Sequence, residues 1–150
     1  MNGGKAFFDT NVLLYMYGAA DLDKRTRAQE LFDLCTASGR MLLSTQVVQE
    51  FYAAGRRKLG MPLGQLRDVV AGLLDLPLVT VRPSHILSAM QTEERYGISF
   101  WDALILAAAE SGGAAVLYTE DLNDGQQYGT VVVRNPFRAE SQPQPSPTRP

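Results

Sequence analysis

Short apolar runs alternate with longer segments of helical spacing along most of this chain, and this alternation restricts the possible folds more than any other feature. The apolar runs lie at 5–8, 41–43, 78–81, 115–118 and 130–133. Between them, apolar residues recur at helical spacing over 11–17, 26–37, 45–59, 62–74, 83–96 and 101–110. Strands that alternate with helices of this kind are typical of βαβ units. We therefore expect an α/β fold with a parallel sheet that is covered by helices on both faces.

The length of 150 residues fits one domain with one core. We assign residues 1–138 to this domain. Residues 139–150, AESQPQPSPTRP, offer no apolar side chains for packing, and we expect this Pro-rich tail to be disordered. No apolar run reaches the roughly 18 residues that span a bilayer, the N-terminus lacks a signal pattern, and Cys35 is the only cysteine. These features predict a cytoplasmic protein that does not contact a membrane.

Two acids follow predicted strands directly. Asp9 stands at the carboxyl end of the first strand, and Asp121 lies just beyond the fourth. Ligands of parallel α/β sheets bind at this edge, where the winding direction reverses. Taken alone, Asp9 is more often a helix N-cap and Asp121 more often a turn residue. The two are neighbours only if the first and fourth strands are adjacent, which the sequence does not prove.

Asp102 is the most informative acid because its helix, WDALILAAA, is apolar on every other side. An unpaired buried carboxylate costs several kcal/mol, so it must be neutralised, hydrogen-bonded or bound to metal. Ser99 three residues earlier offers a second explanation, because the pair fits a capping box variant. Glu50 lies on the border of the apolar stripe of its own helix, where it can reach inward or remain solvated.

Carboxylates that share one pocket need compensation for their charge. Two of them about 4 Å apart repel each other by roughly 4 kcal/mol at an effective dielectric near 20. Mg²⁺ or Mn²⁺, which prefer oxygen ligands, would supply that compensation. A zinc site lacks ligands, because the chain has one cysteine and one histidine, His85, for which we predict a structural or surface role.

At these residues the chain resembles the PIN-domain family, and specifically the VapC-type toxins of bacterial toxin–antitoxin pairs. The matching segments are FFDTNVLLY around Asp9, STQVVQEFY around Glu50, SFWDALILAAA around Asp102 and LYTEDLNDGQ around Asp121. The resemblance implies a three-layer α/β/α domain with a five-stranded parallel sheet. It also implies that Asp9, Glu50 and Asp102 are catalytic metal ligands.

The resemblance gives Asp121 a fourth acidic role, for which Asp124 in the same loop is the competitor. It gives Asn11 and Thr119 the task of ordering the site by hydrogen bonds. The implied activity is Mg²⁺-dependent endoribonuclease cleavage, for which we expect a 5′-phosphate and a 3′-hydroxyl on the products. The implied partners are RNA, a cognate antitoxin protein and a second copy of the chain.

Arg56, Arg57 and Lys58 end the Glu50 helix and are candidate contacts for RNA phosphates, although cations are also favoured at a helix C-terminus without any ligand. The net charge of −2 argues against nucleic-acid binding driven by overall charge, but a local patch remains compatible with it.

Two other function classes compete with the nuclease. A phosphatase of the haloacid dehalogenase type needs a second Asp where this chain has Asn11, and a catalytic lysine where none follows Lys58. A non-catalytic PIN-fold module for RNA binding or protein interaction would be favoured by the loss of an acid, and all four acids are present. Nucleotide binding by a glycine-rich loop has no support, because neither GxGxxG nor a P-loop occurs.

Overall fold

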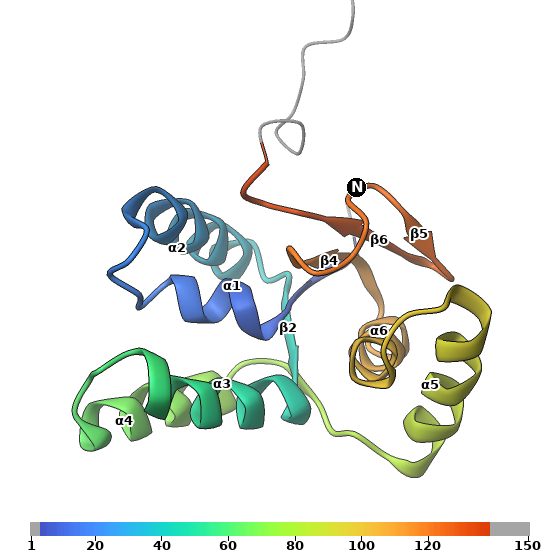
Figure 1. Cartoon of the computed structure of the whole chain (residues 1–150), viewed down its shortest axis with the longest axis horizontal. Helices are drawn as coiled ribbons and strands as arrows, with labels where there is room; N and C mark the ends of the chain where they lie inside the picture. Colours follow the sequence, from blue (N-terminus) through green and yellow to red (C-terminus); the bar gives the residue numbers. More distant parts are fainter. Residues whose placement is uncertain (1–3, 139–150) are drawn as a thin grey trace, which may run out of the picture.

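The computed structural model describes residues 4–138, which form a six-stranded sheet flanked by helices (Figure 1). The strands lie in the order β3-β2-β1-β4-β6-β5. Their bounds are β1 Lys5–Phe8, β2 Met41–Ser44, β3 Leu78–Val79, β4 Ala114–Tyr118, β5 Gln127–Tyr128 and β6 Val131–Arg134. All neighbouring pairs are parallel except β5 and β6. The expected set of five parallel strands is therefore confirmed.

The sixth strand, β5, corrects the prediction, which gave a five-stranded sheet with no strand between 118 and 130. Strand β5 has two residues and pairs antiparallel with β6 through a tight turn at Gly129, whose φ is +59°. Tyr128 is buried and its ring packs edge-on against Tyr96. A strand of two residues is too short for an apolar alternation to indicate it.

The helices form the outer layers of the fold. They are α1 Thr10–Tyr15, α2 Leu22–Ala37, α3 Thr45–Lys58, α4 Leu63–Leu74, α5 Pro83–Tyr96 and α6 Phe100–Ser111. Helices α1 to α4 lie on one side of the central strands and α5 and α6 on the other, so the three-layer expectation is confirmed (Figure 1). Helix α2 begins four residues earlier than predicted, because Asp21 caps it by accepting a hydrogen bond from the amide of Lys24 (3.0 Å).

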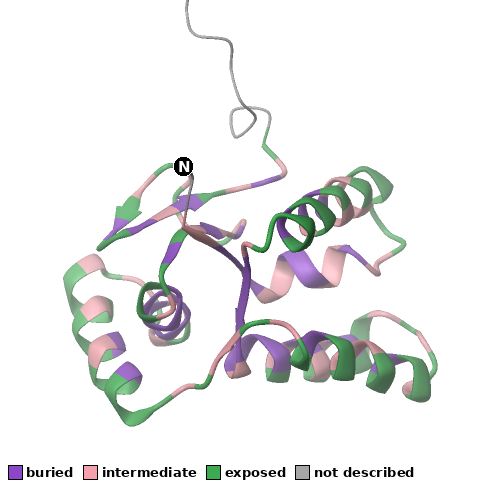
Figure 2. Cartoon of the chain, turned by 180° about the vertical axis from the view of Figure 1, so that it is seen from behind, coloured by how far each residue is buried: buried purple, intermediate pink, exposed green. Residues whose placement is uncertain are grey.

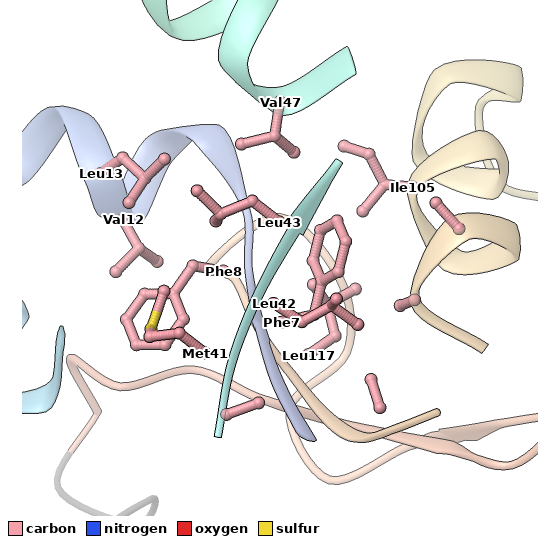
Figure 3. Packing of buried hydrophobic residues seen from close by; sticks show 14 of the residues in the cluster. Phe7, Phe8, Val12, Leu13, Met41, Leu42, Leu43, Val47, Ile105 and Leu117 are labelled. Atoms are coloured by element: carbon pink, nitrogen blue, oxygen red, sulfur yellow. The ribbon is translucent and has the colours of Figure 1, made fainter. Parts of the chain in front are cut away.

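Strand β1 lies at the centre of the core and is enclosed on both faces. Figure 3 shows Phe7 beside Leu117 on the side of α6, and Phe8 beside Val12 on the side of α1. Both phenylalanines are fully buried, and buried residues concentrate along the central strands and α6 (Figure 2). Because this packing fixes β1, the position of the residue after it, Asp9, is fixed as well.

Strands β1 and β4 are adjacent, which the sequence did not prove. Phe8 pairs with Tyr118, so the residues that follow them, Asp9 and Thr119, lie side by side at the carboxyl edge of the sheet. The chain continues from β1 to β2 on one side, while β4 lies on the other side. The carboxyl ends of β1 and β4 therefore flank the point where the winding reverses, at which α/β sheets bind ligands.

Other expectations concern single features. Cys35 is buried and forms part of the core. None of the helices in residues 4–138 is both long and apolar enough to cross a membrane. The tail predicted at 139–150 lies outside the described residues.

The close packing of the end of α6 on the sheet gives a stability prediction. A Cβ on Gly112 would lie 2.6 Å from Leu42 Cδ2 and 2.7 Å from Val79 Cγ2, so Gly112→Ala should lower the free energy of unfolding by about 1–3 kcal/mol. Gly72 in α4 has open space around it, so Gly72→Ala should raise that free energy by about 0.4–1 kcal/mol. Urea denaturation measures both, and a Gly112→Ala variant as stable as the original chain would contradict the packing argument.

Candidate metal centre

Asp9 is the buried centre of the site. It follows β1 and caps α1, where its Oδ1 accepts a hydrogen bond from the Thr10 amide (2.7 Å). Its Oδ2 accepts one from the Thr119 hydroxyl (2.7 Å), and the Asp9 residue is only 4% exposed. The N-cap role and a role in the site are therefore compatible, because they use different oxygens.

Asn11 links the ends of β1 and β4. Its Nδ2 donates to Asp121 Oδ2 (2.8 Å) and lies 3.3 Å from Thr119 Oγ1 and 3.4 Å from Asp9 Oδ2. The amide of Asp121 in turn donates to Thr119 Oγ1 (3.1 Å). Asn11 and Thr119 thus hold Asp9 and Asp121 in one arrangement, which is the geometry expected of residues that order a site.

Asp102 approaches the same point from the first turn of α6. Its backbone amide donates to Ser99 Oγ (3.1 Å), so the predicted cap exists. The Ser99 side chain also hydrogen-bonds to the Asp102 carboxyl, so the carboxylate of Asp102 takes part in the cap as well. The seven residues that follow, 103–109, are all buried, as the apolar sequence indicated.

The carboxylates of Asp9, Asp102 and Asp121 form one group. One oxygen from each lies within 4.8 Å of the other two, and exposure increases from buried Asp9 through half-buried Asp102 to exposed Asp121. None of the lysines and arginines in residues 4–138 forms a salt bridge with these three acids. Hydroxyl, amide and backbone donors are their only hydrogen-bond partners in that part of the chain.

Burial has a clear electrostatic effect on two of the three acids. Burial raises the pKa of the Asp9 carboxyl from its ordinary value of 3.8 to about 7. The hydrogen bonds from Thr119 and Thr10 oppose this shift, and the charges of Asp121 and Asp102 add to it. Burial also raises the pKa of Asp102, with the charges of Asp121 and Glu50 acting in the same direction.

Glu50 lies beside this group but not within it. Its Oε1 accepts from the Thr10 hydroxyl (2.7 Å) and its Oε2 from Gln46 Nε2 (3.1 Å). Gln46 is buried and also donates to the backbone oxygen of Trp101 (3.1 Å). Sequence reasoning missed Thr10 and Gln46; the one available signal is that Gln46 precedes Glu50 by one helical turn.

Asp124, the competitor of Asp121, lies apart from the group. Its Oδ1 accepts from the backbone amide of Asn135 (2.8 Å) at the end of β6. Asp121, and not Asp124, belongs to the group of three carboxylates. For His85 we predicted a structural or a surface role, and the structure shows a structural one. Its ring is buried, and Nδ1 accepts a hydrogen bond from the Arg82 amide (2.8 Å).

The loop that carries Asp121 is tied to two helices. Glu120 forms a salt bridge with Lys24 of α2 (2.9 Å) and accepts from the Tyr15 hydroxyl of α1 (2.7 Å). Lys24 also lies over the Tyr15 ring at 4.6 Å. Sequence reasoning did not identify these three residues, which restrain Asp121 without touching it.

A groove of about 600 Å³ runs from the acidic group along α1. Asn11 and Asp121 line one end, and Lys58 and Leu59 of α3 are also in its wall. Of the three predicted RNA contacts, Lys58 is thus the one at the groove. Arg57 donates to the Ala53 carbonyl of its own helix (3.2 Å), and Arg56 is exposed.

The residues of the acidic group fit a divalent cation. Oxygens bound to one Mg²⁺ at about 2.1 Å lie about 3.0 Å apart when adjacent and about 4.2 Å apart when opposite, so the three oxygens, within 4.8 Å of one another, would draw closer on binding one ion. Asn11 Oδ1 is buried and has no hydrogen-bond partner in the described part of the chain, which leaves one further oxygen beside the group. All of these donors are hard oxygen ligands, which suit Mg²⁺ or Mn²⁺.

Comparison with solved structures finds the same fold in several proteins. VapC20 of Mycobacterium tuberculosis, described as a toxin that cleaves the sarcin–ricin loop, is 21% identical over 78% of this chain and 90% of its own, with a TM-score of 0.63. A chain of a toxin–antitoxin complex from Klebsiella pneumoniae is 19% identical over 89% of this chain and 98% of its own, with a TM-score of 0.67. VapBC from Salmonella typhimurium bound to DNA is 20% identical over 88% of this chain and 98% of its own, with a TM-score of 0.63.

These identities show a shared fold, and a search of curated proteins finds no match. A model of the PIN domain matches residues 6–124, which include Asp9, Glu50, Asp102 and Asp121. That match covers well over half of the chain and all of the elements that bring the carboxylates together. The chain therefore belongs to the PIN-domain family.

Proposed function

We propose that this protein is a divalent-metal-dependent endoribonuclease, and that it is the toxin of a toxin–antitoxin pair. The observation that carries the proposal is the meeting of Asp9, Asp102 and Asp121, whose carboxylate oxygens lie within 4.8 Å of one another. The fold shared with VapC20, a toxin described as cleaving RNA of the sarcin–ricin loop, supports RNA as the substrate.

Asp9, Asp102 and Asp121 would hold the cation, Mg²⁺ or Mn²⁺. A bound divalent cation lowers the pKa of coordinated water and offsets negative charge on a phosphodiester. Glu50 is the acid that lies outside this group of three. It is held beside the group by Thr10 and Gln46, so it is available as a further ligand or as the acceptor of the proton from the attacking water.

The protein itself supplies orientation. Asn11 and Thr119 keep Asp9 and Asp121 facing each other, and the Glu120–Lys24 salt bridge restrains the loop behind Asp121. Water attacks the phosphorus and the bond to the 3′ oxygen breaks, which leaves a 5′-phosphate and a 3′-hydroxyl. Mapping the chemical groups at the ends of the products tests directly which phosphorus–oxygen bond breaks.

The second candidate is a PIN-fold module that binds RNA or protein without cleaving. The uncompensated acidic group favours the enzyme, because a binding module gains nothing from a buried carboxyl whose pKa is raised to about 7. Incubation of the purified protein with total RNA, with Mg²⁺ or with EDTA, separates the two functions. RNA that binds but remains intact with Mg²⁺ and with Mn²⁺ would favour the module.

An antitoxin and a second copy of the chain are the proposed protein partners. The groove beside the acids, lined in part by Leu14 and Leu59, offers a place for an inserted antitoxin segment. The antitoxin is tested by co-purification with the small DNA-binding protein of a neighbouring reading frame. Ile86, Leu87 and Met90 expose apolar surface on α5, and sedimentation measures whether the chain dimerises.

The first prediction concerns the cation ligands. Asp102→Asn should reduce RNA cleavage by at least about a hundredfold and abolish the rise in melting temperature on adding Mn²⁺, because one of the three charged oxygens is lost. Asp68→Asn on the exposed face of α4 is the charge-matched control and should retain both. Asp124→Asn should still cleave, and its inactivity in a folded protein would return the fourth role to Asp124.

The second prediction concerns pH. Because the metal-free Asp9 carboxyl has a pKa of about 7, a cation must displace its proton at lower pH. The dissociation constant for Mn²⁺ should therefore fall about tenfold per pH unit up to about pH 7 and level off above it. Calorimetric titration at several pH values measures this, and a constant affinity between pH 5.5 and 7 would exclude Asp9 as a ligand.

The same shift affects stability without metal. The folded state binds a proton on Asp9 between pH 3.8 and about 7 that the unfolded state has lost, so this residue lowers stability as pH rises through that window. In EDTA, Asp9→Asn should therefore become more stable relative to the original chain as pH rises from about 4 to 7. Urea denaturation across that range provides the measurement, and a difference that does not change with pH would contradict the assignment.

The third prediction concerns RNA contact. Lys58→Ala should raise KM for RNA of any sequence and reduce the slope of log KM against log salt concentration by about 0.7, the loss of one phosphate contact. Arg57→Ala is the control, because Arg57 is engaged with the Ala53 carbonyl. Equal effects of the two variants would indicate a diffuse charge effect and no specific contact at Lys58.

A further inference from the structure

Trp101 is the only tryptophan in the chain and is 63% exposed, although it directly precedes Asp102 of the acidic group. An exposed indole leaves a large apolar face in water, which a folded protein does not need for its own stability. Trp101 lies within the first turn of α6, directly before the residue whose carboxylate belongs to the acidic group.

The Trp101 residue is held in place despite its exposure. Its backbone oxygen accepts a hydrogen bond from Gln46, the buried residue that also binds Glu50. Its ring meets the ring of Phe100 edge-on, with 5.2 Å between centroids. Gln46 therefore links the backbone of Trp101 to Glu50, and the Phe100 ring contacts the indole.

The surroundings of Trp101 differ from those of a protein-docking surface. The other large exposed apolar side chains of the described residues lie on α2, α4 and α5. Trp101 differs from them because it is adjacent in sequence to Asp102 of the acidic group. A hot spot for a protein partner is normally surrounded by further apolar surface, whereas a single aromatic ring beside a phosphate site suits a nucleotide.

We propose that Trp101 is the stacking surface for a nucleobase next to the scissile phosphate, so that the site takes unpaired RNA. This inference rests on the proposed nuclease function. A base face is available for stacking only where the strand is unpaired, in a loop, bulge or single strand. Lys58, at the opposite end of α3 from Gln46, then contacts phosphates on the other side of the cut.

Intrinsic fluorescence tests the contact, because all tryptophan emission of this chain comes from Trp101. The full chain is mixed rapidly with a single-stranded oligoribonucleotide in Mg²⁺, and emission is recorded before turnover. Stacking should quench the emission. An oligonucleotide of the same sequence with an abasic site next to the mapped cut should leave the emission unchanged, although its phosphates are identical.

Variants test the consequence for activity. Trp101→Leu should raise KM by about 5- to 150-fold, the range expected for the loss of one base–aromatic stack, with a smaller change in kcat. Trp101→Phe retains an aromatic face and should recover most of that loss. Leu34→Ala, at an equally exposed apolar residue on α2, is the control and should behave like the original chain. Melting temperatures verify that each variant is folded.

The results separate this inference from the nuclease proposal. Cleavage by the original chain with no quenching, or with equal quenching by intact and abasic RNA, overturns the stacking alone. An unchanged KM in Trp101→Leu does the same. Base-dependent quenching without cleavage in Mg²⁺ or Mn²⁺ retains the stacking and overturns the nuclease. Emission that changes with protein concentration but not with RNA would assign Trp101 to a contact between two copies, against the proposal.

Discussion

Repulsion between carboxylates at the carboxyl ends of β1 and β4 is the constraint on which the site depends. Two ionised groups at 4.8 Å repel by roughly 3.5 kcal/mol at an effective dielectric near 20, and one of the three, Asp9, is almost completely buried. Hydroxyl and amide donors offset only part of this cost, since the pKa of Asp9 is raised to about 7. The fold thus holds these carboxylates in an electrostatically unfavourable arrangement, and a bound hard cation would reduce the repulsion between them.

The sheet tolerates this arrangement because the acids also serve the local structure. Asp9 caps α1 with one oxygen, and the amide of Asp102 completes the cap of α6. The remaining oxygen atoms face the shared point. The structural and functional explanations, which compete when each residue is considered alone, therefore apply to the same residues at once.

The sequence predicted the features that depend on strand ends and helix periodicity: the five parallel strands, and the presence of Asp9 and Asp121 at one edge. It could not predict that Glu50 would lie beside the acidic group and not within it, because that depends on tertiary contacts with Thr10 and Gln46. It missed β5, which is too short for any periodicity. The adjacency of β1 and β4 likewise required the register of the sheet.

The hydrogen bond between Thr119 and Asp9 joins residues separated by 110 positions in the chain. During synthesis, β1 leaves the ribosome long before β4 exists, and the acidic group cannot assemble until both have paired. A nascent chain that has not yet reached Asp121 would lack one of the three grouped carboxylates, so the acidic group cannot be complete until most of the domain has been synthesised. Premature termination anywhere upstream would give a product without a complete centre.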